Sequence, residues 1–323
     1  MSKTQETFDM KNRYESLLAG PAVVALALGS IALNTAQLHA AESTIPLEKS
    51  SMEPIAEPIT EEAVTKAIQE YVFAKYAGDV DVVQSRTHHD IARRVVADTY
   101  QGQPSRDWVQ TYSHDQLQYY GTDLNQIKMD SPEEGRCEIE IFDIEQYTAA
   151  ARVIMEDVVD FMHLVNFEGR WLVADSAVVI LDEAGARAPG KSTKDLKTIE
   201  QIVRDYCIGF YEIDGKKVQD TCHPTLSKRS VEKPENVDFN YFNLITWEEI
   251  EILGETFNKY WGFDPETARC DVEVYEIRDN VAIAKLTGSV WFDYFHLMRV
   301  NDNWSIVNIM YESLPRDRWS DVG

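Results

Sequence analysis

The chain has few basic residues for its length. Its 323 residues include 31 Lys and Arg against 55 Asp and Glu, so the formal net charge is −24. A protein that binds nucleic acid, or the anionic surface of a membrane, presents basic side chains to phosphate groups. The acidic excess therefore argues against both kinds of partner, while an apolar content of 44% is ordinary for a folded protein.

Motifs that bind metals or cofactors, or that activate a nucleophile, are also missing. The four Cys include no CxxC pair, and the seven His form neither HExxH nor a Cys/His cluster at zinc spacing. GxSxG and GxGxxG are absent as well. A GxxxxGK[ST] match at 185–192 follows Asp182 and Glu183, whose charges would repel phosphate, and we interpret it as linker. We therefore expect no metal and no cofactor.

Charged residues are absent from positions 16–41. This stretch is rich in Ala, Val, Leu and Gly, and its end, Leu38-His39-Ala40-Ala41, resembles a signal-peptidase site. We interpret residues 1–41 as a signal peptide, which predicts a periplasmic or secreted protein. The alternative is an uncleaved membrane anchor formed by residues 16–41. Residues 42–59, which are polar and contain three prolines, are expected to form a flexible linker.

The remaining sequence is a tandem duplication. The segment 136–144 recurs at 269–277 with an offset of 133, and the same offset aligns Trp171 with Trp304. Nearer the start of each unit the offset is 135. The predicted organisation is a first domain at 60–181, a linker at 182–194, a second domain at 195–312 and a tail at 313–323.

Each unit places its helices before its strands. A helical period of apolar residues opens both units, and short helices are expected near 79–87 and 216–222. Later segments alternate with a period of two, and the pairs Glu168-Gly169 and Asn301-Asp302 are typical of hairpin turns. This order predicts an α+β fold with two tandem domains, each a curved antiparallel sheet wrapped on N-terminal helices.

Several motifs resemble those of a known family. The second unit contains His223-Pro224, Asp-Tyr-x-x-Leu at 293–297 and Asn-Trp-x-Ile-Val-Asn at 303–308. In these motifs the chain resembles the lumazine-binding-like group of the nuclear transport factor 2-like superfamily, which also holds ketosteroid isomerases and scytalone dehydratase. The resemblance implies two cones with internal pockets, packed on each other as a pseudo-dimer. The first unit departs from the pattern, with His89 in place of Pro and Phe161 in place of Tyr.

His163 and His296 lie on apolar faces of the second-last predicted strand of each unit. Alternate residues of a strand share a face, and every second residue around each of these histidines is almost wholly apolar. We therefore predict that both faces point into the cones and bind a ligand. The opposite faces, with Asp160 and Asp293, are then expected to be where the two units pack. The predicted ligand-binding residues are Val159, Phe161, His163, Phe292, Tyr294, His296 and Met298.

Two further histidines are equivalent in the repeat. His88 and His223 each precede a basic pair, and we expect them either to contact a ligand at the mouth of the cone or to cap a helix end. For His163 and His296 the alternative is also structural, with each ring hydrogen-bonded inside the core.

The cysteines leave several pairings open. Cys137 and Cys270 are equivalent and are expected to be buried apolar residues, with a disulfide across the two units as the alternative. Cys207 and Cys222 have no counterparts in the first unit, and a bridge between them would join a helix to the following turn. The sequence alone does not decide among these arrangements.

These features favour a non-catalytic protein that binds a small apolar ligand or a protein partner. One alternative is an enzyme similar to ketosteroid isomerases or dehydratases, with His163 and His296 as acid or base. A second alternative is a structural adaptor whose cones are filled by side chains.

Overall fold

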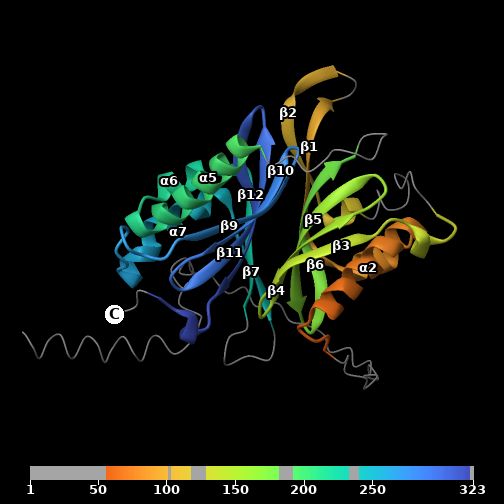
Figure 1. Ribbon diagram of the computed structural model, residues 1–323, viewed down its shortest axis with the longest axis horizontal. Coiled ribbons are helices and arrows are strands. Elements are labelled where there is room, and N and C mark those ends of the chain that lie inside the picture. Colours follow the sequence, from red (N-terminus) through yellow and green to blue (C-terminus); the bar gives the residue numbers. More distant parts are fainter. Residues whose placement is uncertain (1–55, 101–102, 118–128, 182–191, 233–239, 321–323) are drawn as a thin grey trace, which may run out of the picture.

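The computed structural model describes residues 56–100, 103–117, 129–181, 192–232 and 240–320 (Figure 1). The predicted signal peptide, most of the linker at 42–59 and most of the linker at 182–194 lie outside the described residues. Within the part that is described, no helix is both long and apolar enough to cross a membrane.

Each half of the chain opens with two helices and contains six strands. The first half contains α2 (Glu61–Ala77), α3 (Val80–Ser85), β1 (Thr87–Tyr100), β2 (Gln103–Tyr112), a 3₁₀ turn (Pro132–Glu134), β3 (Glu138–Ile144), β4 (Thr148–Ile154), β5 (Val158–Phe167) and β6 (Arg170–Ile180). The second half contains α5 (Thr193–Glu212), α6 (Gly215–Asp220), β7 (Cys222–Glu232), β8 (Tyr241–Ile245), α7 (Trp247–Trp261), β9 (Asp271–Arg278), β10 (Val281–Thr287), β11 (Trp291–Val300), β12 (Asn303–Ser313) and a 3₁₀ turn (Arg316–Arg318). The α+β class and the tandem arrangement are thereby confirmed.

Each half forms one six-stranded sheet. The strand orders are β2-β1-β6-β5-β4-β3 and β8-β7-β12-β11-β10-β9. The pairs β1–β6 and β7–β12 are parallel and the other pairs are antiparallel, so the sheets are mixed rather than wholly antiparallel as expected. The meander of the last four strands was visible in the sequence, whereas the pairing of the first strand with the last joins segments far apart in the chain.

Local sequence explains where the helices begin and end. Thr60 caps α2 by accepting a hydrogen bond from the amide of Ala63 at 3.3 Å, and Thr246 forms a full capping box with Glu249 on α7. Gly78 ends α2 with a φ of 72°, a left-handed conformation that glycine adopts without strain. The equivalent residue after α5 is Ile213, which has a φ of 60°.

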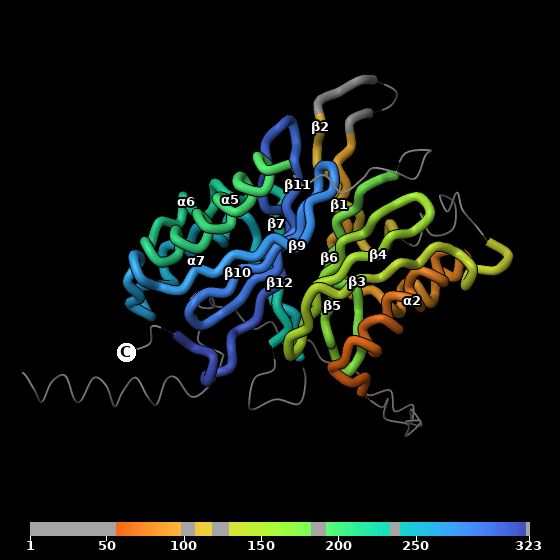
Figure 2. Tube along the Cα trace, in the orientation of Figure 1, coloured from red at the N-terminus to blue at the C-terminus, as the bar shows by residue number. Residues whose placement is uncertain are grey.

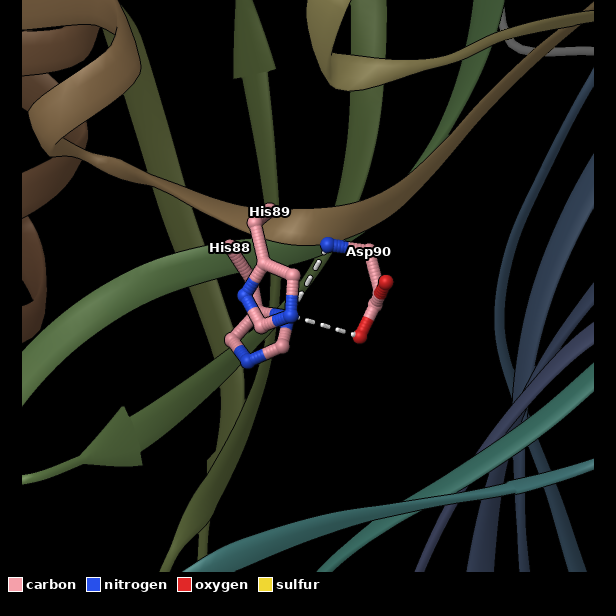
Figure 3. Close-up of side chains that lie close together, drawn as sticks. All are labelled: His88, His89 and Asp90. Carbon is pink, nitrogen blue, oxygen red and sulfur yellow. Dashed lines mark hydrogen bonds and ion pairs between the residues drawn. The ribbon is translucent and has the colours of Figure 1, made fainter. Parts of the chain in front are cut away.

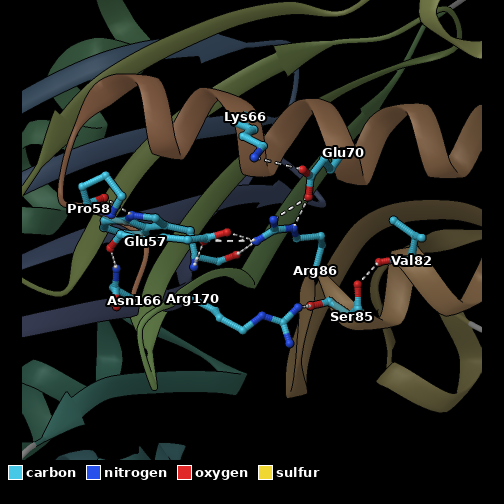
Figure 4. A network of polar contacts seen from close by, with 10 residues as sticks. Glu57, Pro58, Lys66, Glu70, Val82, Ser85, Arg86, Asn166 and Arg170 are labelled. Atoms are coloured by element: carbon cyan, nitrogen blue, oxygen red, sulfur yellow. Dashed lines mark hydrogen bonds and ion pairs between the residues drawn. The ribbon is translucent and has the colours of Figure 1, made fainter. Parts of the chain in front are cut away.

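The last residues of the predicted flexible linker belong to the fold (Figure 4). The Glu57 carboxylate accepts a hydrogen bond from the amide of Trp171 at 2.7 Å and pairs with Arg86 at 2.9 Å. The indole of Trp171 donates to the carbonyl of Pro58 at 3.0 Å. Arg86 also binds Glu70 on α2 at 2.5 Å, so this network attaches the incoming chain to both the helix and the sheet.

The helices lie on the outside and the two sheets face each other. Figures 1 and 2 show α2 at one side of the molecule and α5, α6 and α7 at the other, with both sheets between them. Three apolar cores result. One lies between α2 and the first sheet, one lies between α5, α7 and the second sheet, and the third, which we call the inter-sheet core, takes residues from both sheets.

Candidate functional site

The histidine-bearing strand faces lie between the sheets, not inside the cones. His163 and His296 are fully buried, and the other five predicted ligand-binding residues all belong to the inter-sheet core: Val159, Phe161, Phe292, Tyr294 and Met298. The prediction that these faces point toward the helices is therefore wrong. Both faces of β5 and β11 are buried, so the alternation separates the two faces without showing which one meets the helices.

The two histidine rings stack on each other across this core. Their centroids are 3.7 Å apart and their planes differ by 15°. On the His163 side, Nδ1 lies 3.4 Å from the carboxylate of Asp175, which also pairs with Arg229 of the second half. Asp175 of the first half and Arg229 of the second half thus meet beside the His163 ring.

The second ring has the reciprocal arrangement. His296 Nδ1 lies 3.3 Å from the amide nitrogen of Asn308, and the Asn308 side-chain oxygen accepts a hydrogen bond from Arg94 of the first half at 2.5 Å. By the repeat, Asn308 is the counterpart of Asp175 and Arg94 that of Arg229. The contact between the sheets is therefore built from the same positions in both halves.

Both imidazoles are disposed to stay neutral. Burial lowers the pKa of His296 well below its ordinary value, with further lowering by His163 and Arg94. Burial also lowers the pKa of His163, although Asp175 opposes the change. Neither Nε2 atom has a hydrogen-bond partner among the described residues. This geometry suits a core that joins two sheets, and it does not expose a catalytic acid or base to a ligand.

The strand faces with the buried aspartates are the ones that meet the helices, which reverses the second half of the same prediction. In the first half, Arg93 donates to Asp160 at 2.6 Å and to the Tyr71 hydroxyl at 3.1 Å, and Ser176 donates to Asp160 at 2.5 Å. Asp160 is fully buried. The interior of the first cone therefore contains a charged pair linked to the inner face of α2.

The second half repeats this pair with different donors. Lys228 forms an ion pair with the fully buried Asp293, and the Trp291 indole donates to the same carboxylate at 2.7 Å. Sequence reasoning missed both pairs, although the basic doublets held the information. Because neighbouring strand residues point to opposite faces, the first member of each doublet, Arg93 or Lys228, binds its own aspartate, and the second reaches the other half.

The two cones differ most in what fills them. In the second cone, Phe210 packs edge-on against Phe257 at 5.6 Å and against Trp291 at 6.2 Å, within a larger aromatic cluster. The repeat offsets place Lys75 at the position of Phe210 and Val158 at the position of Trp291. The first cone thus has an amine and a small side chain where the second has two rings.

Lys75 lacks a carboxylate partner in the part of the chain that the structure describes. Its ammonium lies 4.0 Å from the sulfur of Met155 and 5.4 Å from the centre of the Tyr71 ring. Burial lowers its pKa to about 8, and the charge of Arg93 adds to this lowering. Asp160 and Asp157 act on the pKa in the opposite direction, although neither forms an ion pair with Lys75. The side chain is partly exposed, so a ligand entering the first cone would meet this ammonium group.

His88 and His223 lie near the contact between the halves rather than at the mouths of the cones. The ring of His88 packs on Phe242 of the second half, with centroids 4.0 Å apart, and the pKa of His223 is lowered by burial and by Arg94 of the first half. His88 Nδ1 accepts the amide of Asp90 at 3.2 Å, and His223 Nδ1 does the same for its residue two positions on, also at 3.2 Å. The shared role is to cap a backbone amide at the start of a strand.

One group of three potential metal ligands occurs in the described residues (Figure 3). His88, His89 and Asp90 each place a ligand atom within 4.8 Å of the others. The lone pair of His88 Nδ1 is already used by a backbone amide, and burial lowers the pKa of this ring to about 4. The second half has Pro224 and Thr225 at the last two positions and keeps the same turn, so the turn itself needs no metal.

Comparison with known families agrees with the duplicated fold. The family model described as "Putative lumazine-binding" matches this sequence twice, over residues 60–177 and 194–312. The chain belongs to this family. A comparison with curated protein sequences finds no match.

The solved structures found by comparison each cover about two fifths of this family member. An NTF2-like protein of Shewanella baltica OS155 is 16% identical over 39% of this chain and 98% of its own, with a TM-score of 0.33. An NTF2-like protein of Methylobacillus flagellatus KT is 14% identical over 40% of this chain and 98% of its own, with a TM-score of 0.33. A ketosteroid isomerase-like protein of Erwinia carotovora atroseptica SCRI1043 is 14% identical over 38% of this chain and 99% of its own, with a TM-score of 0.30. The family assignment rests on the two sequence matches.

Proposed function

We propose that this protein is an exported binding protein in which the first cone holds a small ligand and the second cone is a scaffold. The observation that carries the proposal is the replacement of Phe210 by Lys75 at the equivalent position. A filled aromatic core stabilises a domain without leaving room for a ligand. A partly buried amine without an ion-pair partner destabilises the free protein. Its presence in the first cone therefore favours a role in binding.

The surroundings of Lys75 define the chemistry of the ligand. Its ammonium offers a hydrogen-bond donor and a positive charge, while the Tyr71 ring and Met155 offer apolar surface. Arg93 is already neutralised by Asp160, so Lys75 is the group that would bind an anionic oxygen. The ligand is therefore a small, mainly apolar molecule that carries a carboxylate or another anionic oxygen.

The other hypotheses from the sequence fare differently. The enzyme alternative relied on His163 and His296 inside the cones, and both residues lie between the sheets, so this version of it is withdrawn. The adaptor hypothesis of filled cones suits the second half, where Phe257, Phe263 and Trp291 pack together. It does not suit the first half, where Lys75 has no ion-pair partner among the described residues.

Native mass spectrometry of the protein purified from its own cell envelope tests the binding proposal. We expect wild-type protein to retain a small molecule, and Lys75→Met to lose it while melting at a similar or higher temperature. Lys66→Met is the matched control, because Lys66 lies on the same helix with 69% of its side chain exposed, and it should retain the adduct. An adduct that both variants retain, or a wild-type protein that never carries one, contradicts the proposal.

Export is the second part of the proposal and rests on the apolar segment at 16–41. We expect the mature protein in the envelope fraction to begin at Ala41 or Glu42. N-terminal sequencing that returns Ser2 or Lys11 would show that the segment is retained.

A further inference from the structure

The cysteines of the second half form one close pair. Cys207 on α5 and Cys270, which immediately precedes β9, both pack in the helix-side core of the second half, and each shifts the pKa of the other. Cys207 Sγ also lies 3.9 Å from the carbonyl oxygen of Arg269, the residue joined to Cys270. Both thiols are free in the structure. Cys207 is thus a neighbour of the backbone that carries Cys270, and a disulfide between them requires their Cβ atoms to lie about 3.5–4.5 Å apart.

The other pairings are not supported in this way. Cys222 directs its sulfur to the Val218 carbonyl, 3.5 Å away, and Cys137 belongs to the helix-side core of the first half, whereas Cys270 packs against that of the second. The two bridges considered from sequence, Cys137 with Cys270 and Cys207 with Cys222, therefore have no support from the geometry.

We propose that Cys207 and Cys270 are a site of oxidative modification, and that a disulfide between them fastens α5 to β9 once the protein reaches an oxidising compartment. The oxidant is a thiol–disulfide oxidoreductase of that compartment. The Cys270 thiolate attacks its disulfide and releases one of its cysteines as a thiolate. Cys207 then loses its proton and displaces the second cysteine. Two protons and two electrons leave the pair, and the oxidoreductase disulfide is reduced to a dithiol.

The electrostatics of the pair fit this order of events. The interaction with Cys207 lowers the pKa of Cys270, and the charge of Arg204 lowers it further. Burial raises the pKa of Cys207 well above its ordinary value. The more exposed sulfur is thus the better nucleophile, and the buried one resolves the mixed disulfide.

The first half provides an internal control for the pair. The repeat places Cys137 at the position of Cys270 and Val72 at the position of Cys207, so the same strand has a thiol without a partner. Burial raises the pKa of Cys137 to about 11. Cys137 should therefore stay reduced under conditions that oxidise the second half.

The decisive experiment treats purified, fully reduced protein with a glutathione redox buffer, so the result does not depend on whether the protein is exported. The protein is then denatured, labelled with a maleimide and mapped after trypsin digestion. We expect linked peptides 205–216 and 270–278, with Cys137 and Cys222 labelled. The oxidised protein should melt at a higher temperature than the reduced protein, and Cys207→Val, which copies the first half, should abolish this difference.

Native protein that keeps all four thiols labelled, or that links a different pair, overturns the proposal. The redox state of the pair in protein taken directly from the envelope then tests whether the disulfide forms in the cell. A linked pair there supports both the site and the oxidising compartment. A pair that links in vitro but is reduced in the envelope fraction contradicts the compartment assigned to it and leaves the close pairing of the two thiols intact.

Discussion

Acidification tests how His296 contributes to stability. The ring is fully buried, and burial together with His163 and Arg94 holds its pKa well below the ordinary value. In the unfolded chain the same ring has a pKa of about 6.5. Between these two values the unfolded chain binds a proton that the native protein does not bind. The free energy of unfolding therefore falls as the pH is lowered through about 6.5.

The size of the effect follows from this difference in protonation. At pH 5.5 the unfolded chain gains about 1.4 kcal/mol from protonation of one such histidine, and at pH 7.5 it gains less than about 0.1 kcal/mol. His163 acts in the same direction, but its contribution is smaller because Asp175 favours the charged ring. The two rings together should account for a loss of about 1.4 to 2.7 kcal/mol over this interval.

Urea unfolding at pH 7.5 and pH 5.5 measures the loss. We expect His296→Gln to be less stable than wild type at pH 7.5 by about 1–3 kcal/mol, because a buried hydrogen bond and ring packing are lost. Its further loss on acidification should be smaller than that of wild type by about 1.4 kcal/mol. His89→Gln is the control for replacing a histidine outside the core, since 72% of that side chain is exposed, and it should cost little stability at pH 7.5. An equal loss in wild type and His296→Gln would show that the buried ring accepts a proton in the folded state, and the reasoning would fail.

Three further substitutions test other parts of the structure. Asp293→Asn leaves the buried Lys228 without its counter-charge and should lower the free energy of unfolding by about 3–5 kcal/mol in urea titrations. Burial raises the pKa of Glu312 to about 7. The native state therefore binds a proton more tightly than the unfolded chain, and the stability that this proton provides is lost as the pH rises through 7. Glu312→Gln should accordingly gain stability relative to wild type between pH 6 and pH 8. Ile213→Gly should raise stability by about 1 kcal/mol in thermal melts, because Ile213 has a φ of 60° where the first half has Gly78.

Features set by neighbouring residues were predictable from the sequence. The expected short helices occur at Val80–Ser85 and Gly215–Asp220. The Asn301-Asp302 turn has φ values of 48° and 66°, which fit a tight hairpin. Two copies of each pattern made these predictions firmer, because a chance match in one unit is not repeated in the other.

The orientation of the sheets was not predictable, for a physical reason. In a strand with one solvent-exposed face, the alternation of polar and apolar residues identifies the buried face. The central strands here are covered by helices on one side and by the other sheet on the opposite side. His163 and Asp160 both lie on fully buried faces, so the polarity of single residues could not tell the two environments apart. The basic doublets, Arg93-Arg94 and Lys228-Arg229, could have indicated the orientation of the sheets. In each doublet the first residue binds an aspartate of its own half and the second binds a residue of the other half.

Placing both units in one chain explains how the two cones can differ. In a dimer of identical subunits, any residue that opens one cone to a ligand also opens the other, and both domains lose the stability of a filled core. In the duplicated chain, Phe210 and Trp291 fill one cone while Lys75 and Val158 occupy the equivalent places in the other. Around the two stacked histidines the inter-sheet core uses equivalent positions of both halves, with Asn308 in the place of Asp175. The less stable cone that we propose binds a ligand can therefore be held by a partner that never dissociates from it.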